Sequence, residues 1–124
     1  MASDPVAVIR DFCAAWSALD TDRMMTYFAA EPTYHNMPGP PAVGTEAVRA
    51  TIQRFLGSWQ KTDWELLNIA AAGNVVFAER VDRTDVGGKH IDLPCVGVFE
   101  MEGDKIKAWR DYFDLATYAN AMKA

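Results

Sequence analysis

The second half of the sequence alternates between apolar and polar residues, and this period of two is the strongest constraint on the fold. The alternation stops at three short segments rich in glycine, aspartate and asparagine, residues 72–74, 85–88 and 102–104. Such segments are typical of turns that join antiparallel neighbours. The sequence therefore predicts four strands, at residues 64–70, 75–84, 89–101 and 105–113.

The first half of the sequence has helical spacing instead. Asp4 and Pro5 are typical of a helix start, because aspartate caps the first turn and proline suits its first position. The apolar stripe of this first helix contains Ile9, Phe12, Cys13, Trp16 and Leu19. A second, short helix is predicted over residues 22–28, with Met24, Tyr27 and Phe28 on its apolar side.

Two more helices are predicted further along the chain. One begins at Gly44 and Thr45, and its stripe contains Val48, Ile52, Phe55, Leu56 and Trp59. The other covers Leu115–Lys123 and closes an opening with Leu115, Tyr118 and Met122. Helices followed by a curved antiparallel sheet predict an α+β fold with helices packed on one sheet face. At 124 residues, we expect one domain over 1–124.

Composition excludes several classes of function. The net charge of −5 comes from 12 basic and 17 acidic residues without a basic run, so we expect neither a nucleic-acid nor a membrane partner. No apolar run spans a bilayer and residues 1–5 do not resemble a signal peptide, which predicts a cytoplasmic protein. Cys13 and Cys95 stand alone in apolar surroundings as reduced packing residues. No second histidine or acid lies at ligand spacing from His35, so we expect no metal.

Asp111 has an unusual place in the last predicted strand. On a regular strand Lys107, Trp109, Asp111 and Phe113 share one face, and Ile106, Ala108, Arg110 and Tyr112 share the other. Asp111 then lies between two large aromatic side chains, where an ionised carboxylate needs a cation or a hydrogen-bond donor. The alternative is a solvated face, or a simple pair with Arg110.

A second carboxylate follows from the strand at 75–84, where Val76, Ala78, Arg80 and Asp82 share a face. If this face is the interior, Arg80 is a buried cation whose planar fork can bind two carboxylates, with Asp82 and Asp111 as the candidates. Two carboxylates near one guanidinium resemble acid/base machinery, because their titrations are coupled. The alternative is a purely structural cluster of ion pairs.

Tyr34 and Asn36 form the third candidate feature. If their segment is extended, the two side chains point the same way, while His35 points to the opposite side. The prolines that follow disfavour a helix there. The alternative is a polar loop in which Asn36 makes a turn.

Taken together, these motifs resemble those of the limonene-1,2-epoxide hydrolase family. The resemblance rests on Tyr-x-Asn-Met-Pro at 34–38, Glu-Arg-Val-Asp at 79–82, Gly-Val-Phe at 97–99 and Trp-Arg-Asp-Tyr-Phe-Asp at 109–114. It extends over almost the whole chain and keeps the order of the motifs. It implies a cone-shaped fold of the nuclear-transport-factor-2-like, SnoaL-like kind, a homodimer, and cofactor-free opening of an epoxide by water.

The resemblance also implies a role for each site residue. Asp82 would protonate the epoxide oxygen, Asp111 would take a proton from the attacking water, and Arg80 would bridge both carboxylates. Tyr34 and Asn36 would hold the water. The pocket for a lipophilic epoxide, such as limonene-1,2-epoxide or a related cyclic or terpene epoxide, is expected among Cys13, Trp16, Phe55, Trp59, Thr84, Leu93, Cys95, Trp109, Phe113 and Tyr118.

Two other functions are compatible with this fold class. One is a ketosteroid-isomerase-like or SnoaL-like isomerase or cyclase, in which a buried aspartate abstracts a proton from carbon. The other is a module that binds a small molecule without catalysis.

Overall fold

The computed structural model of this chain describes residues 4–123. The start of the chain, residues 1–3, where we expect no signal peptide, lies outside the described residues. The helical and extended elements follow one another as α1 (Pro5–Ala15), η1 (Trp16–Ala18), α2 (Thr21–Met25), β1 (Phe28–Asn36), β2 (Ala42–Val43), α3 (Thr45–Ser58), β3 (Trp59–Ala72), β4 (Val75–Val86), β5 (Lys89–Glu102), β6 (Lys105–Phe113) and α4 (Leu115–Lys123).

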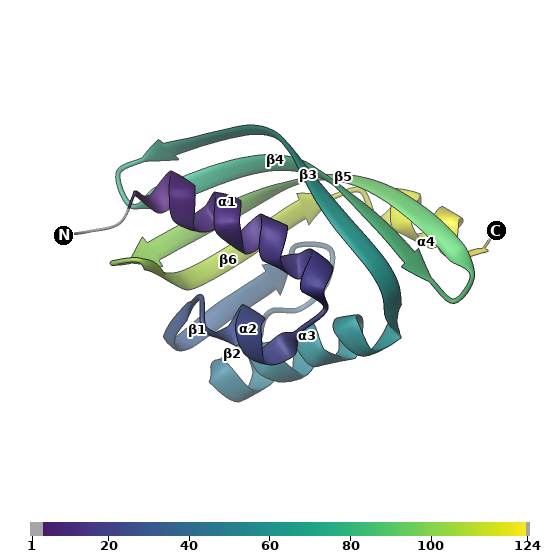
Figure 1. Cartoon of the computed structure of the whole chain (residues 1–124), viewed down its shortest axis with the longest axis horizontal. Helices are drawn as coiled ribbons and strands as arrows, with labels where there is room; N and C mark the ends of the chain where they lie inside the picture. Colours follow the sequence, from purple (N-terminus) through teal and green to yellow (C-terminus); the bar gives the residue numbers. More distant parts are fainter. Residues whose placement is uncertain (1–3, 124) are drawn as a thin grey trace.

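The six strands form one mixed sheet with the order β2-β1-β6-β5-β4-β3. All neighbouring pairs are antiparallel except β1 and β6, which are parallel. The long strands β3, β4 and β5 curve around α1, and α3 lies beside β1 and β2 (Figure 1). Helix α4 packs on β5. The architecture is the predicted α+β cone.

The helices begin where the sequence predicts helix-start signals. Asp4 caps α1, because its side chain accepts a hydrogen bond from the backbone N–H of Val6. Of the predicted stripe, Ile9, Phe12 and Cys13 lie in α1 and are almost completely inaccessible. Trp16 is equally buried but lies in η1, and Leu19 follows η1 in the left-handed region and is only half-buried, so the first helix ends earlier than predicted. Helix α4 has the predicted bounds. Among the described residues, no helix has the length and apolar character needed to cross a membrane.

Two predicted helix ends are wrong, because strand pairing continues further than the pattern indicates. Phe28 lies in β1 and not in the second helix, since its backbone pairs with Ile106 of β6. Trp59 begins β3 and does not continue α3, since it pairs with Val86 of β4. The first strand of the second half therefore begins at Trp59 instead of residue 64.

The predicted faces of β6 are correct only in its second half. Ile106 is fully buried, Lys107 is exposed, and Trp109 and Asp111 are buried. The reason is an irregularity in the pairing with β5. Glu100 is paired with Ala108 but the next residue, Met101, is paired with Ile106, so that no residue of β5 is paired with Lys107. The extra residue reverses the alternation before Trp109.

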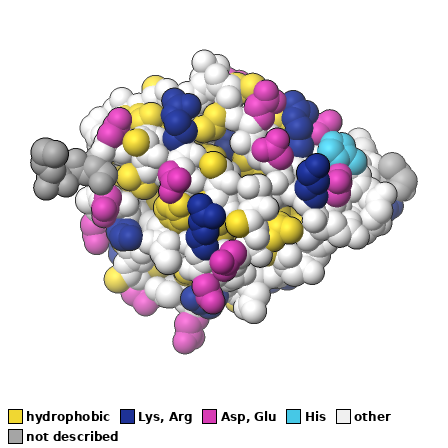
Figure 2. All heavy atoms as spheres, in the orientation of Figure 1, with side chains coloured by type: hydrophobic (Ala, Val, Ile, Leu, Met, Phe, Trp, Pro, Cys, Tyr) yellow, Lys and Arg dark blue, Asp and Glu magenta, His cyan; other side chains and the backbone are white. Residues whose placement is uncertain are grey.

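An aromatic core fills the space between α1 and the sheet. The ring of Phe12 packs edge-on against Trp109 and Phe99, with ring centroids 5.1 and 5.7 Å apart. The outer surface is mixed in character, and on the face shown in Figure 2 basic and acidic side chains lie interspersed with apolar ones. The polar residues discussed next lie on the same side of the sheet as this core.

Candidate active site

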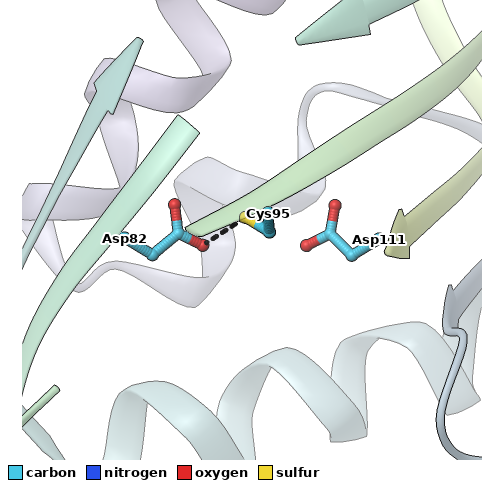
Figure 3. Close-up of side chains that lie close together, drawn as sticks. All are labelled: Asp82, Cys95 and Asp111. Atoms are coloured by element: carbon cyan, nitrogen blue, oxygen red, sulfur yellow. Dashed lines mark hydrogen bonds between the residues drawn. The ribbon is translucent and has the colours of Figure 1, made fainter. Parts of the chain in front are cut away.

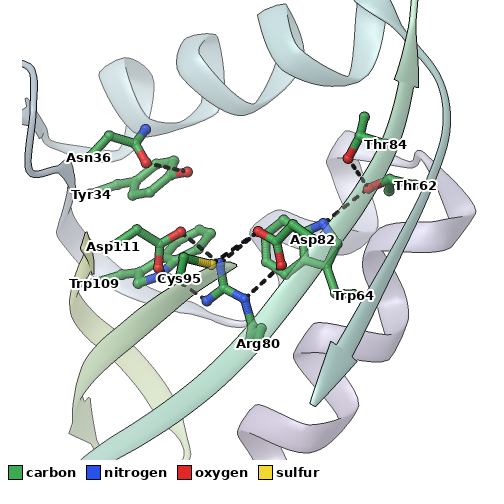
Figure 4. A network of polar contacts seen from close by, with 10 residues as sticks. All are labelled: Tyr34, Asn36, Thr62, Trp64, Arg80, Asp82, Thr84, Cys95, Trp109 and Asp111. Carbon is green, nitrogen blue, oxygen red and sulfur yellow. Dashed lines mark hydrogen bonds and ion pairs between the residues drawn. The ribbon is translucent and has the colours of Figure 1, made fainter. Parts of the chain in front are cut away.

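Arg80 is fully buried and binds two carboxylates (Figure 4). Its Nε and Nη2 atoms lie 2.9 Å from Oδ1 and Oδ2 of Asp82. Its Nη1 and Nη2 atoms lie 3.1 and 2.8 Å from Oδ1 and Oδ2 of Asp111. The guanidinium fork is thus bidentate towards both acids, which is the geometry that an arginine offers and a lysine does not.

Gly97 explains how Arg80 of β4 reaches Asp111 of β6 across the intervening strand. In the sheet register, Gly97 of β5 faces Ala78 on one side and Asp111 on the other. A Cβ atom at Gly97 would lie 2.6 Å from Nη1 of Arg80 and 2.9 Å from Oδ1 of Asp111. The absence of a side chain therefore makes room for the ion pair.

Trp64 of β3 supports the guanidinium from the side. Its ring centroid lies 4.3 Å from Cζ of Arg80, a cation–π contact, and the ring stacks on Trp16 at 4.4 Å. The indole Nε1 of Trp64 donates to Oγ1 of Thr62 at 3.0 Å, and Thr62 in turn shares a hydrogen bond of 2.8 Å with Thr84. Sequence reasoning missed Trp64, because it looks like an ordinary apolar strand residue.

The parallel pairing of β1 with β6 places Tyr34 beside Trp109 and Asn36 beside Asp111. The rings of Tyr34 and Trp109 stack 3.9 Å apart and 6° from parallel. The Tyr34 hydroxyl lies 3.4 Å from Oδ1 of Asn36, which is within hydrogen-bonding reach. The side chains of Tyr34, Asn36 and Asp111 consequently line one wall of the same cavity.

A cavity of about 330 Å³ opens next to these polar groups. Six of the ten residues expected in a substrate pocket line it: Phe55, Trp59, Leu93, Cys95, Phe113 and Tyr118. Leu115, predicted to close an opening, lines it too, whereas Met122 does not. Three residues that sequence reasoning did not include are Pro38, Gly39 and Trp64. Apolar and aromatic side chains therefore provide most of the wall, and Asp82 and Asp111 provide its charges.

Four residues expected in the pocket lie elsewhere. Cys13, Trp16 and Trp109 are almost completely buried in the core behind the cavity, where α1 packs on the sheet. Thr84 lines a smaller neighbouring cavity of about 50 Å³, which also touches Asp82. Helical and strand spacing identifies the inward face, but it does not separate core positions from cavity positions on that face.

The burial of the two acids has electrostatic consequences. Loss of hydration raises the pKa of Asp82 above its ordinary value, Arg80 opposes this rise, and the charge of Asp111 adds to it. Burial disfavours the charged form of Arg80, but the two carboxylates outweigh this and raise its pKa, so the guanidinium stays charged. Burial also raises the pKa of Tyr34, which keeps its hydroxyl protonated and able to donate.

One further cluster has the composition of a metal site. Ligand atoms of Asp82, Cys95 and Asp111 lie within 4.8 Å of one another. However, all four carboxylate oxygens of the two acids already accept hydrogen bonds from Arg80. A metal ion would have to displace this guanidinium and ionise a buried thiol, so the donor set fits a metal poorly.

The comparison with protein families decides where this chain belongs. A family model described as the limonene-1,2-epoxide hydrolase catalytic domain matches residues 3–123. The chain belongs to this family. A curated relative of the chain is the epoxide hydrolase EphG of Mycobacterium tuberculosis (strain ATCC 25618 / H37Rv), 33% identical over 66 residues. This match covers 53% of our chain and 44% of the relative, so less than half of that protein's length is matched.

Solved structures agree with the family's fold. An LEH-like epoxide hydrolase of M. tuberculosis has a TM-score of 0.84 and 23% identity, covering 98% of this chain and 92% of that chain. A SnoaL-like protein of Shewanella putrefaciens CN-32 has a TM-score of 0.83 and 13% identity, covering 99% and 98%. The fold of this limonene-1,2-epoxide hydrolase family member is therefore SnoaL-like and nuclear-transport-factor-2-like.

Proposed function

We propose that this chain is a cofactor-independent epoxide hydrolase that adds water to a lipophilic epoxide and yields a vicinal diol in one general acid/base step. The observation that carries the proposal is the pair Asp82 and Asp111, held by one buried guanidinium at the wall of an apolar cavity. Membership of the limonene-1,2-epoxide hydrolase family supports it. Limonene-1,2-epoxide or a related cyclic or terpene epoxide is the proposed substrate.

Asp82 is the proposed general acid. An epoxide oxygen leaves poorly unless it receives a proton as the ring opens, and an aspartate with its ordinary pKa has no proton to give at neutral pH. Burial raises the pKa of Asp82, and this favours the protonated form that the role requires. Its carboxyl group lines the cavity, so a bound epoxide can reach it.

Asp111 is the proposed general base, and Tyr34 and Asn36 are proposed to hold the attacking water with it. Arg80 and the indole N–H of Trp109 donate to the Asp111 carboxylate and hold its oxygens in place at the cavity wall. Tyr34 and Asn36 offer a hydroxyl and an amide on the same wall. Three groups around one water would fix its direction of attack, which lowers the entropic part of the barrier.

The apolar part of the cavity is proposed to bind the hydrocarbon part of the substrate. Phe55 and Trp59 stack on each other with centroids 5.4 Å apart, and both line the cavity. Leu115 and Tyr118 of α4 line it as well. Burying hydrocarbon against these walls would orient the epoxide between the two acids and keep other nucleophiles away.

A proton-transfer isomerase or cyclase is the second candidate. The observation in its favour is the likeness of the fold to a SnoaL-like protein. Such a proton transfer has less need of Arg80 and of a fixed water than epoxide hydrolysis has. Incubation with a cyclic ketone that has an acidic α-proton would separate the two functions, because an isomerase exchanges this proton for deuterium from solvent and an epoxide hydrolase does not.

The decisive experiment is a hydrolysis assay with purified protein on terpene, cycloalkene, styrene and lipid epoxides, followed by chiral analysis of the diols. We expect turnover of at least one class. Asp82→Asn and Asp111→Asn should each reduce kcat by orders of magnitude, because a general acid or base typically contributes about 10²–10⁴-fold. Folded variants with near-normal rates would refute the assignment, and binding without turnover would favour a non-catalytic binding module.

A single turnover in water labelled with heavy oxygen tests the one-step mechanism. If water attacks directly, the first diol already contains solvent oxygen. If an aspartate attacked instead, the first diol would carry unlabelled protein oxygen and the label would enter the carboxylate through an ester intermediate. Mass spectrometry of the diol and of the digested protein distinguishes the two.

A homodimer is also proposed, through the outer face of the sheet. Phe77 of β4, Val96 of β5 and Tyr112 of β6 are 43%, 37% and 45% exposed there. Val96 faces Tyr112 directly in the register, so these side chains are near neighbours. Large apolar side chains on adjoining strands of an open sheet are typical of a protein interface, and oligomers with twofold symmetry bury the same patch from both subunits.

A further inference from the structure

Cys95 lies in the wall of the candidate site, next to the proposed acid. Its Sγ atom is 3.5 Å from Oδ2 of Asp82 and donates a hydrogen bond to it. The residue is 5% exposed and lines the main cavity. Figure 3 shows Cys95 between the carboxylates of Asp82 and Asp111. On β5 it directly faces Arg80, so its side chain points to the same side of the sheet as the guanidinium.

The two oxygens of Asp82 are not equivalent. Oδ2 accepts hydrogen bonds from Nη2 of Arg80 and from Sγ of Cys95. Oδ1 accepts one hydrogen bond, from Nε of Arg80. A carboxyl oxygen has two in-plane lone pairs, so two donors saturate Oδ2 while Oδ1 keeps one lone pair for a proton.

We propose that Cys95 is a positioning residue for Asp82: by donating its thiol hydrogen to Oδ2, it makes Oδ1 the oxygen that carries the acid's proton. The inference rests on the proposed function, because it deepens the role of Asp82 as the acid that opens the epoxide. A proton restricted to one oxygen has one direction of delivery, whereas a proton shared between two oxygens is correctly placed only part of the time.

The remaining groups near Asp82 are compatible with a neutral, donating thiol. The titratable and charged groups around Asp82 are Arg80 from β4, Asp111 from β6, Tyr34 from β1 and Tyr118 from α4, with Cys13 of α1 behind the cavity. Burial raises the pKa of Cys95 well above its ordinary value, and the two carboxylates add to the rise. Cys95 therefore remains a thiol, which donates a hydrogen bond but is a weak nucleophile towards a bound epoxide.

The step balances without a change at sulfur. The proton on Oδ1 of Asp82 moves to the epoxide oxygen as the carbon–oxygen bond breaks. Water forms the new bond to that carbon and gives a proton to Asp111. Asp82 ends as a carboxylate and Asp111 as an acid, so one proton must return before the next turnover, while Cys95 keeps its hydrogen throughout.

The test uses Cys95→Val, which fills the space but has no donor, and Cys95→Ser, which keeps a donor. A donor to the carboxylate favours the charged form, so its loss should move the falling, high-pH limb of kcat/KM to higher pH in Cys95→Val. The kcat at the optimum should fall about threefold to tenfold, the range of a single weak hydrogen bond. Cys95→Ser should keep the limb at or below the wild-type position and most of kcat.

Cys13→Val serves as a matched control, since it replaces the other buried thiol, which does not donate to Asp82. Whatever the effect of Cys13→Val on the rate, the high-pH limb of its kcat/KM profile should lie at the same pH as in the wild type. No shift in Cys95→Val, or equal shifts in Cys95→Val and Cys95→Ser, would overturn the proposal, because Cys95 would then act only by filling space.

A second measurement does not depend on turnover. The S–H stretching band in the infrared does not overlap with other protein bands. Subtracting the spectrum of Cys95→Val from that of the wild type isolates the S–H band of Cys95. We expect a hydrogen-bonded band that moves towards the free-thiol position as Asp82 is protonated, and no such titration in Asp82→Asn. A free-thiol band at every pH would refute the role of Cys95. If no epoxide were hydrolysed, the proposed function would fail while this titration still decides the contact.

Discussion

The indole N–H of Trp109 donates a hydrogen bond of 2.6 Å to Oδ1 of Asp111, two residues further along the same strand. Both side chains are buried, and the same carboxylate oxygen also accepts from Nη1 of Arg80. Three donors from two residues thus fix the plane of the Asp111 carboxylate. Trp109 does not line the cavity, so it acts on the site through the lining residues that it contacts, Asp111 and Tyr34.

Trp109→Phe should lower kcat by about 10- to 150-fold, because a hydrogen bond to a charged group is worth roughly 1.5–3 kcal/mol and phenylalanine has an aromatic ring but no N–H donor. Steady-state kinetics and a thermal melt give the two readouts. Trp16→Phe is the matched control, since Trp16 is equally buried but its Nε1 has no hydrogen-bond partner among the described residues. Both variants should lose stability. A loss of kcat as large in Trp16→Phe would show that the effect comes from packing.

The pH dependence should follow Asp82. Because its pKa is raised above 3.8 in the folded protein, the protonated acid persists to higher pH than in a free aspartate, and kcat/KM should fall only as pH rises through the raised value. The same shift stabilises the fold at pH below 3.8, and this contribution is lost as pH rises through the folded-state pKa. A pH–rate profile measures the pH at which kcat/KM falls. A fall at or below the pH range in which an ordinary aspartate titrates would contradict the prediction.

Gly97→Ala should damage both stability and activity. The added methyl group would lie 2.6 Å from Nη1 of Arg80 and 2.9 Å from Oδ1 of Asp111, closer than non-bonded atoms approach, so one of the buried charges must move. Overpacking of this kind typically costs about 1–3 kcal/mol. Denaturant unfolding and kcat are the measurements.

Gly57→Ala is the matched glycine control for that experiment. Gly57 lies in α3, and nothing lies within 4 Å of the position that its Cβ would occupy. In a helix, alanine is favoured over glycine by about 1 kcal/mol, so this variant should be as stable as wild type or more so. If Gly97→Ala were also as stable as the wild type, the lack of a side chain at Gly97 would not be what lets Arg80 reach Asp111.

Arg80→Lys should be severely impaired although the charge is kept. An ammonium group cannot make two bidentate contacts, so at least one of the acids would lose its cationic partner inside the protein. Breaking a buried ion pair costs about 3–5 kcal/mol. Thermal melts and kinetics should both show the loss. A fully active Arg80→Lys variant would mean that the two acids need a nearby charge but not the fork.

Tyr112→Asp should convert a homodimer to a monomer, because a carboxylate would be buried without a partner at the proposed interface. Light scattering after size-exclusion chromatography measures the mass. Val43→Asp is the control, since Val43 is 67% exposed on the edge strand β2 and away from the proposed interface. A monomeric wild-type protein at high concentration would argue against the dimer.

The sequence predicts the inward face of β4 well, since Val76, Ala78 and Arg80 are all fully buried there. It also predicts why Arg80 needs Asp82 and Asp111, because a buried cation requires counter-charges. By contrast, the reversal at Lys107 arises from pairing with β5, and the strand start at Trp59 arises from pairing with β4. Such long-range pairing leaves no local signal in the sequence.

Some site residues could not be found in this way for a related reason. Trp64 is an apolar strand residue like any other until the sheet curves and brings its ring next to Arg80. Cys95 is among the expected pocket residues, but its contact to Asp82 could not be predicted, because it exists only through the pairing of β4 with β5. Gly97 in a strand indicates a close approach, but which atoms approach it depends on the whole register.

The one parallel pairing in the sheet, between β1 and β6, joins the beginning of the chain to its last strand. Asn36 and Asp111 become neighbours only through this pairing, and contacts between such distant segments form slowly because a long loop must close first. During synthesis, Tyr34 and Asn36 emerge from the ribosome long before their partners exist. On the wall proposed to hold the attacking water, the neighbours of Tyr34 and Asn36 are therefore added last, whereas Arg80 and Asp82 lie on one strand, β4, from the start.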